Sequence, residues 1–251
     1  MEHIGERLVW HYIPFTNIAL PLGGVNILTV FNTLVVMVLL WVAMAIALRK
    51  TSRIPTRGQL VLEQFIGMFD GLVTSSLEYE TVAQNRRFLP LIASLFLFLV
   101  LSNFMGFLPS PIFEEPTGDI NCTLALGMMA IVIATYCGVK AKGVRGYFGE
   151  LLGPMWSQED VSGGAAIAGK LSALFFLPLN VIGEMAKVVS ISFRLFGNII
   201  GGAIIITVVS TLVYNVGFPL GLNLFFVFFV GAVQAFVFTM LTLTYIAVAI
   251  K

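Results

Sequence analysis

Long uncharged stretches dominate the pattern of polar and apolar positions along this chain. They extend from Leu8 to Leu48, from Phe88 to Phe113, from Ile120 to Val139 and, apart from Arg194, from Val188 to Ile250. A helix that spans a bilayer needs about 20 predominantly apolar residues. The last stretch is long enough for two such helices and is interrupted only around the segment YNVGFPLGLN. The pattern therefore predicts five membrane spans, the last two of them a helical hairpin.

The fold class that this pattern predicts is an all-α polytopic membrane protein, with the last two spans forming a long, strongly tilted hairpin. After the first span, apolar residues recur at three- and four-residue spacing while Glu63 and Asp70 lie on the opposite side, which indicates an amphipathic interfacial helix. The shorter segment VRGYFGELLGPMW is interpreted in the same way. The expected parts of this single membrane domain, residues 1–251, are an external segment at 1–24, spans at 25–48, 88–108, 120–139, 178–216 and 218–250, and a cytoplasmic interfacial helix at 57–85.

Composition and charge agree with a membrane protein and indicate its orientation. Hydrophobic residues make up 58% of the chain and charged residues only 11%, against about 25% charged residues in ordinary soluble domains. Of the 14 lysines and arginines, Arg7 precedes the first span, Arg194 lies within the last apolar stretch, and the others fall on one side of the predicted spans. By the positive-inside rule that side is cytoplasmic. We therefore expect a multi-pass protein of a bacterial plasma or inner membrane, with its N-terminus outside and its C-terminus in the cytoplasm.

Motifs of soluble or intramembrane enzymes are absent from the sequence. Cys122 and Cys137 are too few and too far apart for a disulfide framework, and with only His3 and His11 as histidines no metal site is expected. No HExxH, GxSxG or Walker motif occurs. Neither a cofactor nor a nucleic-acid partner is expected.

Arg194 is the one charged residue of the hairpin stretch, and its position is costly. At the centre of a spanning helix, arginine costs about 2.5–3.5 kcal/mol on insertion scales. A helix from Pro178 to the glycine-containing interruption would be roughly 57 Å long, so strong tilt across a core of about 30 Å places Arg194 near mid-membrane depth. The alternative is that Arg194 snorkels to the cytoplasmic headgroups, which a shorter upright helix beginning near it would allow.

The residues that share a helix face with Arg194 are small or polar. Helical spacing aligns Lys187, Ser190, Arg194, Asn198 and Gly201. Gly197 and Gly201 form a small-xxx-small pair, which permits close approach of another helix. This face is therefore expected to meet a partner helix.

A polar side chain in the second arm of the hairpin matches one in the first. Gln234 is the strongly polar residue in the middle of that arm, and Asn198 and Gln234 are nearly equidistant from a turn centred near Gly217. We expect them at one level, in a polar cluster with Arg194, although simple interhelical hydrogen bonding is an alternative explanation. No acidic residue in either arm is level with Arg194, so its carboxylate partner is expected from another chain.

Three sequence blocks around these residues carry a resemblance to a known family. They are RRFLPLIASLFLFLVLSNFMGFLP, RLFGNIIGG and VQAFVFTMLTLTYIAVAI. In order and spacing they closely resemble subunit a of the F-type ATP synthases, the membrane stator that faces a ring of c subunits. The resemblance covers most of the chain from about residue 25 to the C-terminus.

The resemblance implies an ion-translocating role and two offset aqueous half-channels, one opening to each side of the membrane. Arg194 matches the family's essential arginine, and Asn198 and Gln234 match the polar positions beside it. The missing carboxylate would be the ion-binding acid of each c subunit, whose anionic form Arg194 would favour. The rotor-facing residues would be Ser190, Gly197 and Gly201. The expected partners are the c-subunit ring, the peripheral-stalk b subunits, the soluble ATPase sector and the lipid bilayer, and the chain would not be catalytic on its own.

The sequence departs from common patterns of that family. Many members place a carboxylate nine residues after the arginine or a histidine in the last span, where this chain has Ala203 and Val227. Glu184, ten residues before Arg194, is a candidate for lining a half-channel, or else an interfacial glutamate at a helix start. The coupling ion is left open between proton and sodium. The alternative function is an independent secondary transporter or channel in which Arg194 binds an anionic substrate.

Overall fold

The computed structural model describes residues 9–10, 25–49, 57–77, 85–108, 113–151, 164–213 and 217–251. The chain forms two compact units, one of Met1–Thr123 with Phe193–Met240 and the other of Leu124–Ser192 with Leu241–Lys251. Most of the predicted external segment 1–24, the basic connection at 50–56 and the end of the segment VRGYFGELLGPMW lie outside the described residues.

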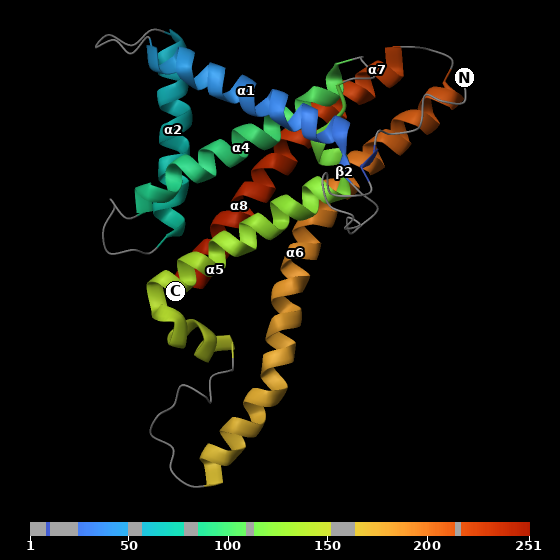
Figure 1. Ribbon diagram of the computed structural model, residues 1–251. Coiled ribbons are helices and arrows are strands. Elements are labelled where there is room, and N and C mark those ends of the chain that lie inside the picture. The colour runs from blue at the N-terminus through green and yellow to red at the C-terminus, as the bar shows by residue number, and fades with distance from the viewer. Residues whose placement is uncertain are drawn as a thin grey trace. The chain divides into compact units, whose positions relative to one another are not determined.

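Helices make up nearly all of the described structure (Figure 1). Five segments of the described chain are long and apolar enough to cross a membrane: Ile27–Ile46, Arg86–Phe107, Ile120–Tyr147, Leu177–Leu212 and Gly217–Ile250. The predicted fold class is therefore confirmed. The bounds are β1 Val9–Trp10, β2 Val25–Asn26, α1 Ile27–Arg49, α2 Arg57–Ser76, η2 Arg86–Phe88, α4 Leu89–Phe104, η3 Met105–Phe107, η4 Pro116–Gly118, α5 Ile120–Leu151, α6 Gly164–Leu212, α7 Gly217–Leu224, the π-helix η5 Phe225–Val230 and α8 Gly231–Ile250.

Helix α4 lies at the centre of the first unit, in contact with α1, α2 and η5. The amphipathic helix α2 runs across α4 (Figure 1) and packs its aromatic side chains there. The ring of Phe96 on α4 lies 5.1 Å from that of Phe69 and 5.9 Å from that of Phe65. Phe69 and Val73 are fully buried, whereas Ile66 of the same apolar face remains 48% exposed. Some apolar residues of α2 thus pack in the protein core, while others form an exposed apolar surface.

An ion pair fixes α2 to the beginning of the second span. Arg86 donates from Nε to Asp70 Oδ1 at 3.0 Å and from Nη2 to Asp70 Oδ2 at 2.8 Å. The paired, planar geometry of an arginine and a carboxylate gives such a contact directional specificity. Asp70, predicted on the polar side of α2, therefore links that helix to the beginning of the second span.

Helix α6 begins earlier than the sequence predicted. It starts at Gly164 and continues through Pro178, so the interpretation of Pro178 as a helix start is wrong. A proline removes one backbone donor, and spanning helices tolerate this where neighbouring groups satisfy the freed carbonyl.

The second arm of the hairpin changes its helical winding partway along. Residues Phe225–Val230 form a π-helix between α7 and α8. Gly202 of α6 lies against this segment, because a methyl group there would come 3.0 Å from Phe226 Cδ1. The two arms thus approach closely where a glycine of α6 faces the π-helical segment of the second arm.

Close helix contacts and a kink define the second unit. The backbone of α5 is non-helical at Gly143, with φ of 76°, a value that favours glycine, and the helix bends after this point (Figure 1). Gly138 lies so near the end of α8 that a methyl group there would come 2.9 Å from the carbonyl oxygen of Ala249.

Candidate functional site

Arg194 lies exposed on α6. Its guanidinium has no hydrogen bond or ion pair with any described residue. A guanidinium carries five N–H donors and remains charged throughout the physiological range. An unpaired arginine within an apolar span therefore indicates a partner that this chain does not supply in its described parts.

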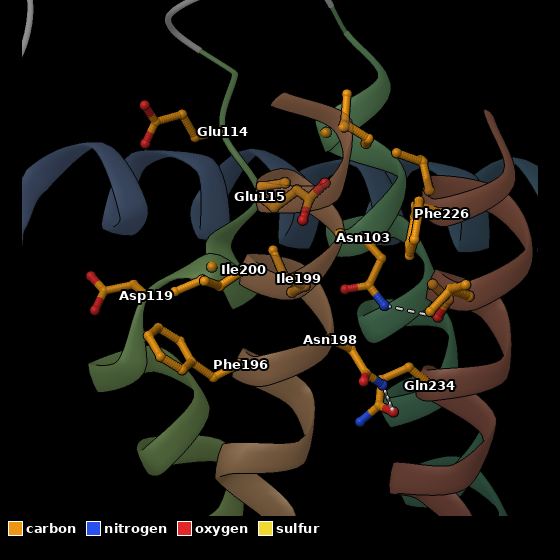
Figure 2. A pocket seen from close by; sticks show the side chains of 18 of the residues that line it. Asn103, Glu114, Glu115, Asp119, Phe196, Asn198, Ile199, Ile200, Phe226 and Gln234 are labelled. Carbon is orange, nitrogen blue, oxygen red and sulfur yellow. Dashed lines mark hydrogen bonds between the residues drawn. The ribbon is translucent and has the colours of Figure 1, made fainter. Parts of the chain in front are cut away.

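Asn198, one helical turn further along α6, is joined to α8. Its Nδ2 donates a hydrogen bond to Gln234 Oε1 at 2.6 Å (Figure 2). Gln234 is only 4% exposed, and its Nε2 has no partner among the described residues. The structure thus brings together the two carboxamides that the sequence analysis placed at one level.

The glycines beside Arg194 leave one face of α6 open. A methyl group added at Gly197 or Gly201 would meet no heavy atom of the described chain within 4 Å. Gly202, in contrast, is buried against Phe226. Ser190, in the second unit, is exposed as well. The open glycines remove bulk from the surface on which Arg194 lies.

A cavity of about 670 Å³ lies beside Asn198 and Gln234 in the first unit, and we call it the hairpin cavity. It is bounded by α4, by the loop that precedes α5, by α6 and by the η5–α8 arm (Figure 2). Its polar lining residues include Asn103, Glu115, Asp119, Asn198 and Gln234. A polar chamber therefore extends from the loop before α5 to the level of the carboxamide pair.

Asn103 connects three walls of the hairpin cavity and was not predicted. Its Nδ2 donates to the carbonyl oxygen of Gly231 at 2.8 Å, and its Oδ1 accepts a hydrogen bond from Thr117 Oγ1 at 2.8 Å. The only signal in the sequence was an asparagine within the apolar stretch VLSNFMG. Because buried polar groups are nearly always hydrogen-bonded, such a residue indicates a tertiary contact without naming its partner.

Glu184 lies in another cavity, of about 330 Å³, in the second unit. Its Oε1 accepts a hydrogen bond from Lys187 Nζ at 2.5 Å, and that ammonium lies 5.8 Å from the ring centroid of Tyr245. Lys187 therefore turns toward Glu184 and α8. The structure places Glu184 in a cavity wall, inside α6 and not at a helix start.

These features define a class: a multi-pass membrane protein with an unpaired intramembrane arginine and polar cavities between its helices. The chain matches the family model of the ATP synthase A chain over residues 29–247. It is 37% identical to ATP synthase subunit a of Moorella thermoacetica over 98% of this chain and 97% of that relative. It is also 36% identical to ATP synthase subunit a of Aliarcobacter butzleri, over 80% and 79% of the two chains, and 29% identical to that of Priestia megaterium, over 94% of both.

The chain therefore belongs to the ATP synthase subunit a family. It is a membrane component of an ATP synthase complex and works together with other subunits of the membrane sector. The predicted family membership is confirmed.

Proposed function

We propose that the chain is the ion-translocating stator subunit of an F-type ATP synthase, with Arg194 as the group that discharges the rotor. The observation that carries this proposal is that Arg194 is exposed on a glycine-bordered face and unpaired within the described chain. A carboxylate presented by a c subunit would supply the missing partner. The open glycines suit a partner that must slide past.

The mechanism follows from the cost of charge in lipid. A rotor carboxylate surrounded by lipid stays neutral, with its proton or ion bound, because burial disfavours the charged form. Opposite Arg194 the anion is favoured, so the coupling ion leaves. The fixed positive charge also bars direct passage of a cation between the two half-channels. Arginine suits this position better than lysine because it keeps its proton when desolvated.

Two cavities are candidates for the two half-channels. The hairpin cavity reaches Asn198 and Gln234, a helical turn beyond Arg194, and the cavity at Glu184 lies ten residues before Arg194 along α6. With the N-terminus outside, the first would open outward and the second toward the cytoplasm. An ion would enter by one, ride the turning ring through lipid and leave by the other.

Rotation is driven by the membrane potential in this proposal. Moving one elementary charge through 100 mV releases about 2.3 kcal/mol. The chain itself performs no ATP chemistry. Its partners would be the c-subunit ring, the peripheral-stalk b subunits and, through the stalks, the soluble ATPase sector.

Purification and vesicle assays test this function. An affinity-tagged chain extracted from membranes should be recovered with a ring oligomer and a soluble ATPase. Inverted vesicles containing the complex should acidify on addition of ATP, and repeating the assay with and without sodium and an ionophore identifies the coupling ion. Recovery of a lone chain that transports an anionic substrate would overturn the proposal in favour of a secondary transporter.

A further inference from the structure

The loop before α5 inserts a carboxylate, Glu115, into the hairpin cavity. The side chain of Glu115 lies against Gly106 of η3, where an added methyl group would collide with it. Figure 2 shows its carboxylate pointing toward Asn103, whereas the carboxylates of Glu114 and Asp119 point the other way. Glu115 thus occupies space that only a glycine at position 106 leaves free.

Three acidic residues of the described chain line this cavity, and their contacts differ. Asp119 Oδ1 accepts a hydrogen bond from the backbone N–H of Asn121 at 2.9 Å, and its Oδ2 accepts one from Thr29 Oγ1 at 3.1 Å. Both of its oxygens therefore hold the start of α5. Glu114 is exposed. Glu115 is half-buried, and its backbone carbonyl accepts a hydrogen bond from the N–H of Gly118, but its carboxylate has no hydrogen bond or ion pair with any described residue. The carboxylate therefore takes no part in holding the fold together.

The surroundings of Glu115 favour a reversible proton carrier. Burial raises the pKa of the Glu115 carboxyl from 4.5 to about 7. The other titratable groups of the described chain that line the cavity are Glu114 and Asp119, and no described lysine or arginine lines it. A group whose pKa lies near the ambient pH can both accept and release a proton efficiently.

The hairpin cavity is polar and large enough to hold water. Besides its acidic side chains, its lining includes the carboxamides of Asn103, Asn198 and Gln234. A polar cavity of sufficient size holds ordered water. The cavity volume of about 670 Å³ far exceeds the roughly 30 Å³ that one water molecule occupies in the liquid.

We propose that Glu115 carries the translocated proton through the hairpin cavity, in place of the carboxylate that position 203 lacks in this chain. This inference rests on the half-channel function proposed above. During entry, a carboxylate oxygen of Glu115 takes a proton from a hydronium ion on the outer side, whose O–H bond breaks to leave water, and the carboxyl becomes neutral. Its O–H bond then breaks, and the proton passes through cavity water, level with Asn198 and Gln234, to the ionised rotor carboxylate. Glu115 regains its negative charge, and exit is the same sequence reversed.

ATP-driven acidification of inverted vesicles in sodium-free buffer tests this inference on the assembled complex. Glu115→Gln should lower the rate by about tenfold or more, with normal amounts of complex in the membrane. Glu63→Gln, on the exposed surface of α2, is the matched control and should leave the rate unchanged. In the Glu115→Gln chain, Ala203→Glu supplies a carboxylate from another wall of the same cavity and should restore much of the rate.

Gly106→Ala provides a second test that keeps every titratable group and covers the case in which Glu115→Gln does not assemble. Its methyl group must displace the Glu115 side chain, so the rate should fall and its pH dependence should shift. A rate and a pH profile equal to those of the unmodified chain, for either Glu115→Gln or Gly106→Ala, would overturn the inference. An unmodified chain that moves sodium instead of protons would do the same.

Arg194→Ala, assayed in parallel, separates this inference from the proposed function. No pumping by Arg194→Ala together with normal pumping by Glu115→Gln overturns the role of Glu115 alone. Normal pumping by both variants overturns the stator mechanism as well.

Discussion

Asn198 and Gln234 lie across the hairpin from each other, with Asn198 Nδ2 2.6 Å from Gln234 Oε1. The bond links α6 to α8 directly beside the turn that carries Arg194. Its geometry fixes the level at which the two arms meet, and it leaves Gln234 Nε2 buried without a hydrogen-bond partner among the described residues.

The coupling of this pair can be measured. Gln234→Leu removes the acceptor of Asn198, and Asn198→Leu removes the donor, so each change should lower stability by about 1–3 kcal/mol and should slow ATP-driven pumping. The double variant should cost less than the sum of the two, with a coupling energy of about 1 kcal/mol. Thermal unfolding and vesicle acidification of the four chains provide the measurement.

Ser210→Ala is a suitable control for that cycle. The Ser210 hydroxyl donates to the carbonyl oxygen of Ile206 within α6, so its loss should leave both stability and pumping nearly unchanged. Strict additivity of the Asn198 and Gln234 substitutions would show that the bond between them contributes nothing.

The membrane spans could be predicted from sequence because lipid imposes one strong rule. Every backbone polar group must be satisfied within the bilayer, so an apolar stretch of sufficient length is a helix. The contact between Asn198 and Gln234 could also be predicted. In two antiparallel helices joined by a turn, residues at equal sequence distances from the turn lie side by side. Neither inference required knowledge of side-chain packing.

The role of the loop before α5 could not be predicted in this way. Glu115 belongs to the hairpin cavity because Gly106 leaves room for it and because Thr117 is held by Asn103. These are tertiary contacts between segments that have no periodic pattern, so they cannot be predicted from the spacing of residues along the chain. The prediction of a helix start at Pro178 was wrong for another reason. The local preference of proline for the first turn of a helix is overridden here, because the helix continues on both sides of it.

The orientation of the chain remains a prediction that cysteine labelling can test. Because basic residues gather on the predicted cytoplasmic side, a cysteine at Glu114, in the loop before α5, should react with a membrane-impermeant maleimide in intact cells. A cysteine at Lys142 should react only after the membrane is opened. Labelling of position 142 in intact cells would invert the proposed topology.

The rotor-facing surface of α6 can be identified by crosslinking. Cysteines at Ser190, Asn198 and Gly201 should crosslink to cysteines flanking the c-subunit carboxylate, because these positions are exposed or half-buried on the face of Arg194. By helical spacing Ile199 and Ile206 lie on other sides of α6 than Arg194, and they should give much lower yields. Equal yields from the two sets would show that another face meets the rotor.

The proposed mechanism depends on the positive charge at position 194, and Arg194→Ala in assembled complexes tests it most directly. We expect full assembly, no ATP-driven pumping or ATP synthesis, and a passive proton leak through the membrane sector. Arg194→Lys should fail as well, because an ammonium loses its proton more readily and lacks the planar fork of donors. The decisive measurement is ATP-driven acidification of vesicles that carry Arg194→Ala: if Arg194 discharges the rotor there should be none, and a rate near that of the unmodified complex would contradict this mechanism.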